Sequence, residues 1–167
     1  MRSLWLYLVF LVSGFAALLY QIVWQRALFV IFGINVEAVT IVVTAFMLGL
    51  ALGSLVGGAI SKDPKRPALL MFGFVEIGIG AFGVVSIPLF HAAGALTLGA
   101  SPFVTAIVTF LLTLCPTMLM GGTLPLLVAH TVRTSGNVGK SVGLLYYVNT
   151  LGPRLVRVDR VRAARLR

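Results

Sequence analysis

Charged residues are scarce in this chain of 167 residues, where Asp, Glu, Lys and Arg together make up 10% of the sequence. A water-soluble domain carries about 25% charged residues, because its surface must be hydrated. Hydrophobic residues instead make up 59%, and the mean hydropathy is +1.07. The composition therefore argues against a soluble domain and predicts an all-α, polytopic integral membrane bundle whose partner is the lipid bilayer.

Cysteine and metal-ligating residues are also few. Cys115 is the one cysteine, so no internal disulfide is possible. His91, His130 and Cys115 are too scattered for metal-ligand spacing, and no nucleophile–base–orienter set is present. We therefore predict no catalytic residue, no metal and no cofactor. The G-x-G-x-x-G pattern at residues 78–83 lies inside an apolar run with no preceding strand, so we interpret its glycines as helix packing.

The net charge of +9 is unevenly distributed. Six of the 13 basic residues are arginines within residues 154–167. Without this tail, 7 basic and 3 acidic residues remain, a net charge of +4. This pattern is typical of membrane-protein loops rather than of a nucleic-acid-binding surface, so we expect no nucleic-acid partner.

Four apolar runs are long enough to cross a membrane, since a spanning helix needs roughly 20 apolar residues. The predicted spans cover residues 4–24, 36–60, 68–90 and 103–129. A fifth helix begins near residue 141 and fails after Gly152, which leaves a short stub at 141–152. We therefore predict a transmembrane domain at residues 1–152, followed by a basic tail at 153–167.

The first span has an alternative interpretation as a cleaved signal peptide, with Arg2 as the basic head and residues 14–16 as a small-x-small cleavage pattern. The apolar run continues well beyond the roughly 7–15 residues of a signal, which favours a retained helix. Tyr20 and Trp24 share one helix face at the end of this span, where aromatic rings are expected at a membrane interface.

The basic residues outside the tail predict the orientation. One side of the predicted bundle holds the amino terminus and the second and fourth loops, whereas the other side has Arg26 alone. The basic residues of the first side are Arg2, Lys62, Lys65, Arg66, Arg133 and Lys140. The positive-inside rule therefore places the amino terminus in the cytoplasm.

Small residues recur at helical spacing in two spans. In the second span one stands at every fourth position from Ala45 onward, which lets another helix approach closely. In the third span, glycines share one face with Glu76. We predict helix packing at Gly49, Gly53, Gly57, Gly73, Gly80 and Gly83.

Glu76 is the one acidic residue deep inside a span. Ionisable side chains at membrane depth mark a pathway, a proton site or a buried polar contact. Two interpretations stay open for Glu76: a proton or cation site, and a packing hydrogen bond between helices. Gln21 in the first span is a further candidate, for which a structural hydrogen bond is favoured over substrate contact.

Hydroxyl groups recur every fourth residue in the fourth span, and include those of Thr113 and Thr117. They would either line a polar crevice or bond to their own backbone and a neighbouring helix, the commoner use. The segment 116–125, PTMLMGGTLP, predicts a kink, with an unwound binding site as the alternative. The candidate substrate or proton pathway thus comprises Glu76, Gln21, Thr113 and Thr117.

Several stretches together resemble the bacterial membrane proteins that fuse a major-facilitator-like helical bundle to a spermidine-synthase-like domain. They are SGFAALLYQIVWQR (13–26), AFMLGLALGSLVGGAI (45–60), VEIGIG (75–80), PTMLMGGTLPLL (116–127) and VGLLYYVNTLG (142–152). The resemblance implies a multi-pass domain of the bacterial cytoplasmic (inner) membrane that is non-catalytic by itself. It also implies a synthase domain or a second copy of the chain as partner.

The sequence departs from that family at two places. Members often have a glutamate where this chain has Gln21, and the segment after Gly152 reads like an out-of-frame translation. We therefore expect a frameshift or truncation near residue 153, before the synthase domain that would perform aminopropyl transfer. Two further hypotheses stay open. One is a transporter-type half bundle that moves a small solute such as a polyamine, and the other is a truncated product with little activity.

Overall fold

The computed structural model describes residues 4–32, 36–136, 139 and 142–143. Within these residues the chain forms four helices and no strand. They are α1 (Leu4–Phe32), α2 (Val36–Ser61), α3 (Ala68–Leu96) and α4 (Pro102–Ser135). All four are long and apolar enough to cross a membrane, which confirms the predicted all-α membrane bundle. Apart from residues 142 and 143, the predicted stub at 141–152 and the tail lie outside the described residues.

Three helices are longer than the spans predicted from the sequence. Helix α1 continues to Phe32 instead of ending at Trp24, α3 continues to Leu96, and α4 continues to Ser135. A run of about 20 apolar residues is what crosses the hydrocarbon layer. The helix itself does not stop at that boundary, because its backbone groups remain hydrogen-bonded as it passes through the polar headgroup region.

Helix α4 has distinct signals at both ends and is continuous between them. The Ser101 side chain accepts a hydrogen bond from the Val104 N–H at 3.4 Å, and Pro102 occupies the first turn. Gly136 ends the helix with a φ of 69°, and its N–H donates to the Val132 carbonyl at 2.8 Å.

The two internal prolines of α4, Pro116 and Pro125, do not interrupt it. The segment 116–125 is helical throughout, so the alternative of an unwound binding site is wrong. Close packing accounts for this result, since Pro116 is fully buried in the bundle and the neighbouring glycines lie against α2.

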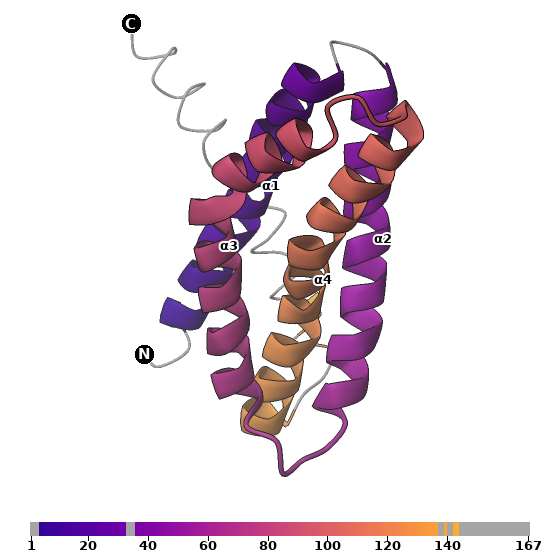
Figure 1. The fold of residues 1–167 in the computed structure, drawn as a ribbon. Coiled ribbons are helices and arrows are strands. Elements are labelled where there is room, and N and C mark those ends of the chain that lie inside the picture. Colours follow the sequence, from indigo (N-terminus) through magenta and orange to yellow (C-terminus); the bar gives the residue numbers. More distant parts are fainter. Residues whose placement is uncertain (1–3, 33–35, 137–138, 140–141, 144–167) are drawn as a thin grey trace, which may run out of the picture.

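Helix α4 lies between α2 and α3 (Figure 1). Its most extensive contact is with α2, whereas α1 packs more loosely against the other three helices. Two apolar clusters nevertheless attach α1 to the bundle. One is centred on Trp24 and Phe90, and the other brings Leu6 and Phe10 of α1 against Phe72 of α3.

The contact between α2 and α4 is made by backbone atoms at glycines. A Cβ built on Gly53 would overlap the Met118 carbonyl group, and one on Gly57 would come within 2.8 Å of the Gly122 Cα. Gly121 in turn lies against the backbone of Leu50. Glycines on both helices therefore permit the close approach that small residues allow in membranes.

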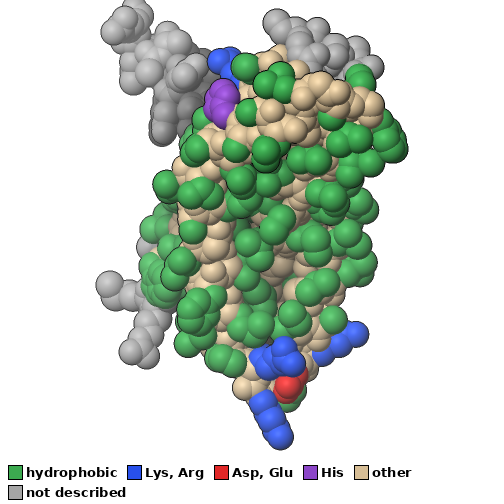
Figure 2. Space-filling view, in the orientation of Figure 1, with side chains coloured by type: hydrophobic (Ala, Val, Ile, Leu, Met, Phe, Trp, Pro, Cys, Tyr) green, Lys and Arg blue, Asp and Glu red, His purple; other side chains and the backbone are tan. Residues whose placement is uncertain are grey.

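Charged side chains lie at the two ends of the face seen in Figure 2, and hydrophobic side chains cover the region between them. At one end, the guanidinium of Arg133 in α4 holds the loop between α2 and α3. It donates to the carbonyls of Ser61, Asp63 and Arg66 at 2.8, 2.8 and 2.7 Å. The Arg66 side chain lies 3.5 Å from the Asp63 carboxylate.

Candidate functional site

Glu76 of α3 and Ser13 of α1 meet between these two helices, although 63 positions separate them in the sequence. The Ser13 hydroxyl donates to the Glu76 carboxylate with an O–O distance of 2.7 Å. Both residues are partly buried. A carboxylate removed from water requires hydrogen bonds or an opposite charge, and Ser13 supplies one hydrogen bond.

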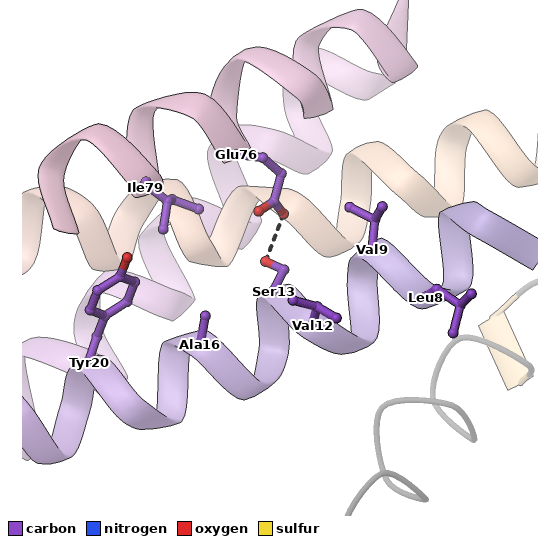
Figure 3. Close-up of a pocket in the computed structure, with 9 residues that line it drawn as sticks. Leu8, Val9, Val12, Ser13, Ala16, Tyr20, Glu76 and Ile79 are labelled. Atoms are coloured by element: carbon purple, nitrogen blue, oxygen red, sulfur yellow. Dashed lines mark hydrogen bonds between the residues drawn. The ribbon is translucent and has the colours of Figure 1, made fainter. Parts of the chain in front are cut away.

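These two residues lie in a groove between α1 and α3 with a volume of about 350 Å³. Figure 3 shows their side chains pointing toward each other, with Tyr20 and Ile79 on one side of the pair and Leu8 and Val9 on the other. The lining residues are Leu8, Val9, Val12, Ser13, Ala16 and Tyr20 from α1, and Glu76, Ile79 and Gly80 from α3. We call this space the Glu76 groove.

The Glu76 groove is apolar apart from a few groups and is open on its outer wall. Leu8 and Val12 on that wall are 54% and 64% exposed. These exposed apolar side chains are of the kind that contacts lipid or another helix in a membrane.

No basic side chain neutralises Glu76 among the described residues, whose one ion pair joins Arg66 to Asp63. The carboxylate therefore has a hydroxyl partner but no cationic partner within the described part of the chain. Chemically, such a group can bind a proton or a cation, or can accept further hydrogen bonds.

An aromatic cluster that includes Tyr20 lies at one end of the Glu76 groove. The Tyr20 ring stacks on Trp24, with centroids 5.3 Å apart and an interplanar angle of 18°. The Tyr20 hydroxyl occupies the space beside Gly83, where a Cβ would overlap it. Trp24 also contacts the rings of Phe46 and Phe82, so this cluster links α1 to α2 and α3.

The interface position predicted for Trp24 is wrong, because its side chain is completely buried within the bundle. Its indole Nε1 has no hydrogen-bond partner among the described residues. The prediction relied on Trp24 lying at the end of α1, but the helix continues for eight more residues. Tyr20 and Trp24 do share one helix face, and that face packs on other helices.

The hydroxyl groups of α4 lie outside the Glu76 groove. Thr113 donates to the Thr109 carbonyl at 2.8 Å, one turn earlier. Thr117 donates to the Thr113 carbonyl at 3.0 Å and reaches the Ala45 carbonyl of α2 at 3.3 Å. Both threonines are fully buried. Their hydroxyls thus bond to their own helix and to a neighbour, which is the commoner of the two predicted uses.

The remaining predicted residues fall into three environments. Gln21 is partly buried on α1 and does not line the groove. Gly49 packs on Thr117, whereas Gly73 and Gly80 have open Cβ positions with no atom within 4 Å. Among the described residues, the helix packing predicted for Gly73 and Gly80 is therefore not made at their Cβ positions, and Gly80 instead lines the groove.

Ser13 is the site residue that sequence analysis missed. It was visible only as a polar interruption of the first apolar run. To predict that this hydroxyl faces a carboxylate, one must know which faces of α1 and α3 meet. That depends on the packing of the whole bundle. The described residues contain no group of three or more His, Cys, Asp or Glu side chains suited to a metal ion.

Comparison of the chain with protein-family models, with curated proteins and with solved structures found no match.

Proposed function

We propose that this chain is the non-catalytic membrane domain of a spermidine-synthase-like fusion protein of the bacterial cytoplasmic membrane. Its amino terminus and the loop between α2 and α3 would lie in the cytoplasm. Four helices that are long and apolar enough to cross a membrane support the membrane assignment. Lys62, Lys65, Arg66 and Arg133, gathered around that loop, support the orientation.

The family assignment rests on the sequence resemblance, and four of the five family-like stretches contact each other in pairs. Stretch 13–26 meets stretch 75–80 through the hydrogen bond between Ser13 and Glu76. Stretch 45–60 meets stretch 116–127 through the glycine contacts of α2 and α4. Four of these stretches thus contribute residues that position helices against each other, which is compatible with the proposed family and is expected of any packed helical bundle.

The partner in this proposal is a catalytic domain encoded downstream. The DNA sequence after codon 152 tests it directly. A spermidine-synthase-like coding region in another frame would support the proposal and would explain the basic tail as a frameshift. An intact gene with no synthase-like region downstream would contradict it.

A transporter-type half bundle for a small solute, such as a polyamine, is the second candidate. The observation in its favour is a membrane-embedded carboxylate, Glu76, that lacks a basic partner among the described residues. Uptake of labelled spermidine tests this function. The vesicles contain the full-length fusion protein of the proposal above, called the parent protein, and its Glu76→Gln variant is the control. Absence of uptake by the parent would exclude it.

A further inference from the structure

We propose that the Glu76 groove binds a hydrophobic primary amine with a single positive charge, which enters sideways from the bilayer. The proposal involves the same carboxylate as the second candidate function but goes beyond it, because it names an amine with one charge, and not a polyamine, as the ligand. Binding does not require transport, so the two ideas can fail separately. The starting point is the Glu76 carboxylate, which has a hydroxyl partner at 2.7 Å and no cationic partner among the described residues.

An ammonium group complements this site. It donates up to three hydrogen bonds and carries a positive charge, which balances the negative charge of an ionised carboxylate removed from water. A neutral ligand would leave that charge uncompensated, whereas an anion would be repelled by it. An ionised Glu76 would therefore select a cation over a neutral ligand or an anion.

The rest of the lining limits the ligand to one charge. Apart from Ser13, Tyr20 and Glu76, its side chains are aliphatic or glycine. A second or third ammonium group, as in spermidine, would lie against apolar side chains with no carboxylate to pair with, which is costly. An aliphatic chain instead gains free energy from contact with Ala16 and Ile79.

The position of Glu76 along α3 fits an amphiphile. Glu76 is eight residues from the start of α3, or about 12 Å at 1.5 Å per residue, so it lies toward one end of the span. Along α1, Tyr20 lies seven residues beyond Ser13, or about 10 Å farther into the bundle. The ammonium group would bind near the polar end, and the chain would extend toward Tyr20.

The size and lining of the groove argue against a phospholipid as the ligand. A volume of about 350 Å³ is at the small end of the roughly 300–1,000 Å³ typical of ligand sites. The lining also contains no Lys or Arg for a phosphate, which in an aminophospholipid would lie close to the Glu76 carboxylate. A simple alkylamine avoids this repulsion.

The experiment measures saturable binding of radiolabelled octylamine to the full chain in phosphatidylcholine nanodiscs, with empty nanodiscs subtracted. We expect unlabelled octylamine to compete with the label. Octanol should compete at least about tenfold less well, because it lacks the charge-assisted hydrogen bond, which contributes about 1.5–3 kcal/mol. Spermidine and phosphatidylethanolamine should also compete at least about tenfold less well, because of the extra ammonium groups of the first and the phosphate of the second. The Glu76→Gln variant, which retains shape and hydrogen bonding, should bind octylamine about tenfold or more weakly.

A pair of glycine variants tests the groove without altering the carboxylate. Gly80 and Gly73 both lie in α3 with open Cβ positions, but only Gly80 lines the groove. Gly80→Leu should therefore block octylamine binding, whereas Gly73→Leu should leave it unchanged. This pair keeps the test decisive even if Glu76→Gln fails to fold.

Several results would overturn the proposal. They are equal affinity for octylamine and octanol, equal competition by spermidine or phosphatidylethanolamine, and unchanged octylamine binding in Gly80→Leu. Octylamine binding without spermidine uptake by the parent would support the ligand class and reject polyamine transport, which separates the two hypotheses.

Discussion

Gly53 of α2 faces the carbonyl group of Met118 in α4 so closely that a Cβ on Gly53 would overlap it. The obstacle is backbone rather than the flexible end of a side chain, so the helices themselves would have to move apart. This contact lies within the most extensive helix–helix interface of the bundle. Its disruption should therefore reduce the stability of the whole domain.

The variant Gly53→Ala should lower the free energy of unfolding by about 1–3 kcal/mol, the usual cost of overpacking. Gly58→Ala is the matched control, because it lies in the same helix and its Cβ would meet no atom within 4 Å. Alanine is intrinsically better than glycine in a helix by about 1 kcal/mol, so the control should be neutral or stabilising. Thermal unfolding in detergent measures both, and equal effects would contradict the contact.

Arg133 should protect the loop between α2 and α3 from opening. Its planar guanidinium reaches three loop carbonyls, an arrangement that a lysine ammonium does not reproduce. We expect Arg133→Lys to raise hydrogen exchange of the loop amides about fivefold, since one hydrogen bond contributes about 1 kcal/mol. Lys65→Gln is the control, because it also removes a long basic side chain from this end but leaves the three bonds intact.

The loop could be held by the hydrogen bonds of Arg133 or by its positive charge alone. Arg133→Lys distinguishes the two, because lysine keeps the charge but not the geometry of the guanidinium. If Arg133→Lys exchanged as slowly as the unmodified chain, positive charge alone would hold the loop. The hydrogen bonds to Ser61, Asp63 and Arg66 would then contribute little.

The sequence was sufficient to predict the helices as elements because the signal is strong. Long apolar runs separated by polar loops admit one structure in a membrane, since backbone groups must be satisfied within each segment. The helix ends were less predictable. Gln25 and Arg26 end the first apolar run, but both are compatible with a helix, and α1 continues past them to Phe32.

The candidate site was only partly predictable for a different reason. Glu76 can be recognised from the sequence, because a carboxylate within an apolar span is unusual. Ser13 cannot, because serine is common in membrane helices. The glycine pattern of α2 predicted a close contact but not its partner, which the structure identifies as α4. Partner choice depends on the shapes of all four helices at once, and local patterns carry no such information.

Trp24 should contribute far more to stability than Trp5, although both lie in α1. Trp24 is fully buried and contacts three other aromatic rings besides Tyr20, whereas Trp5 is 51% exposed. We expect Trp24→Ala to cost roughly 3–5 kcal/mol of unfolding free energy, the range for large aromatic residues in a core. Trp5→Ala should cost much less, and comparable losses would contradict the buried position of Trp24.

The proposed orientation can be tested with single cysteines. Cys115 is first replaced by serine, which leaves a chain without cysteine. Lys65→Cys in the loop between α2 and α3 and Leu98→Cys in the turn before α4 then place one exposed thiol at each end of the bundle. In intact spheroplasts, a membrane-impermeant maleimide should label Leu98→Cys at once and Lys65→Cys only after permeabilisation. This expectation follows from the positive-inside rule, by which the loop that carries Lys62, Lys65 and Arg66 would stay in the cytoplasm. The reverse labelling pattern would show that the amino terminus and the loop between α2 and α3 lie outside the cytoplasm. A partner that binds this side of the bundle would then not be a cytoplasmic one.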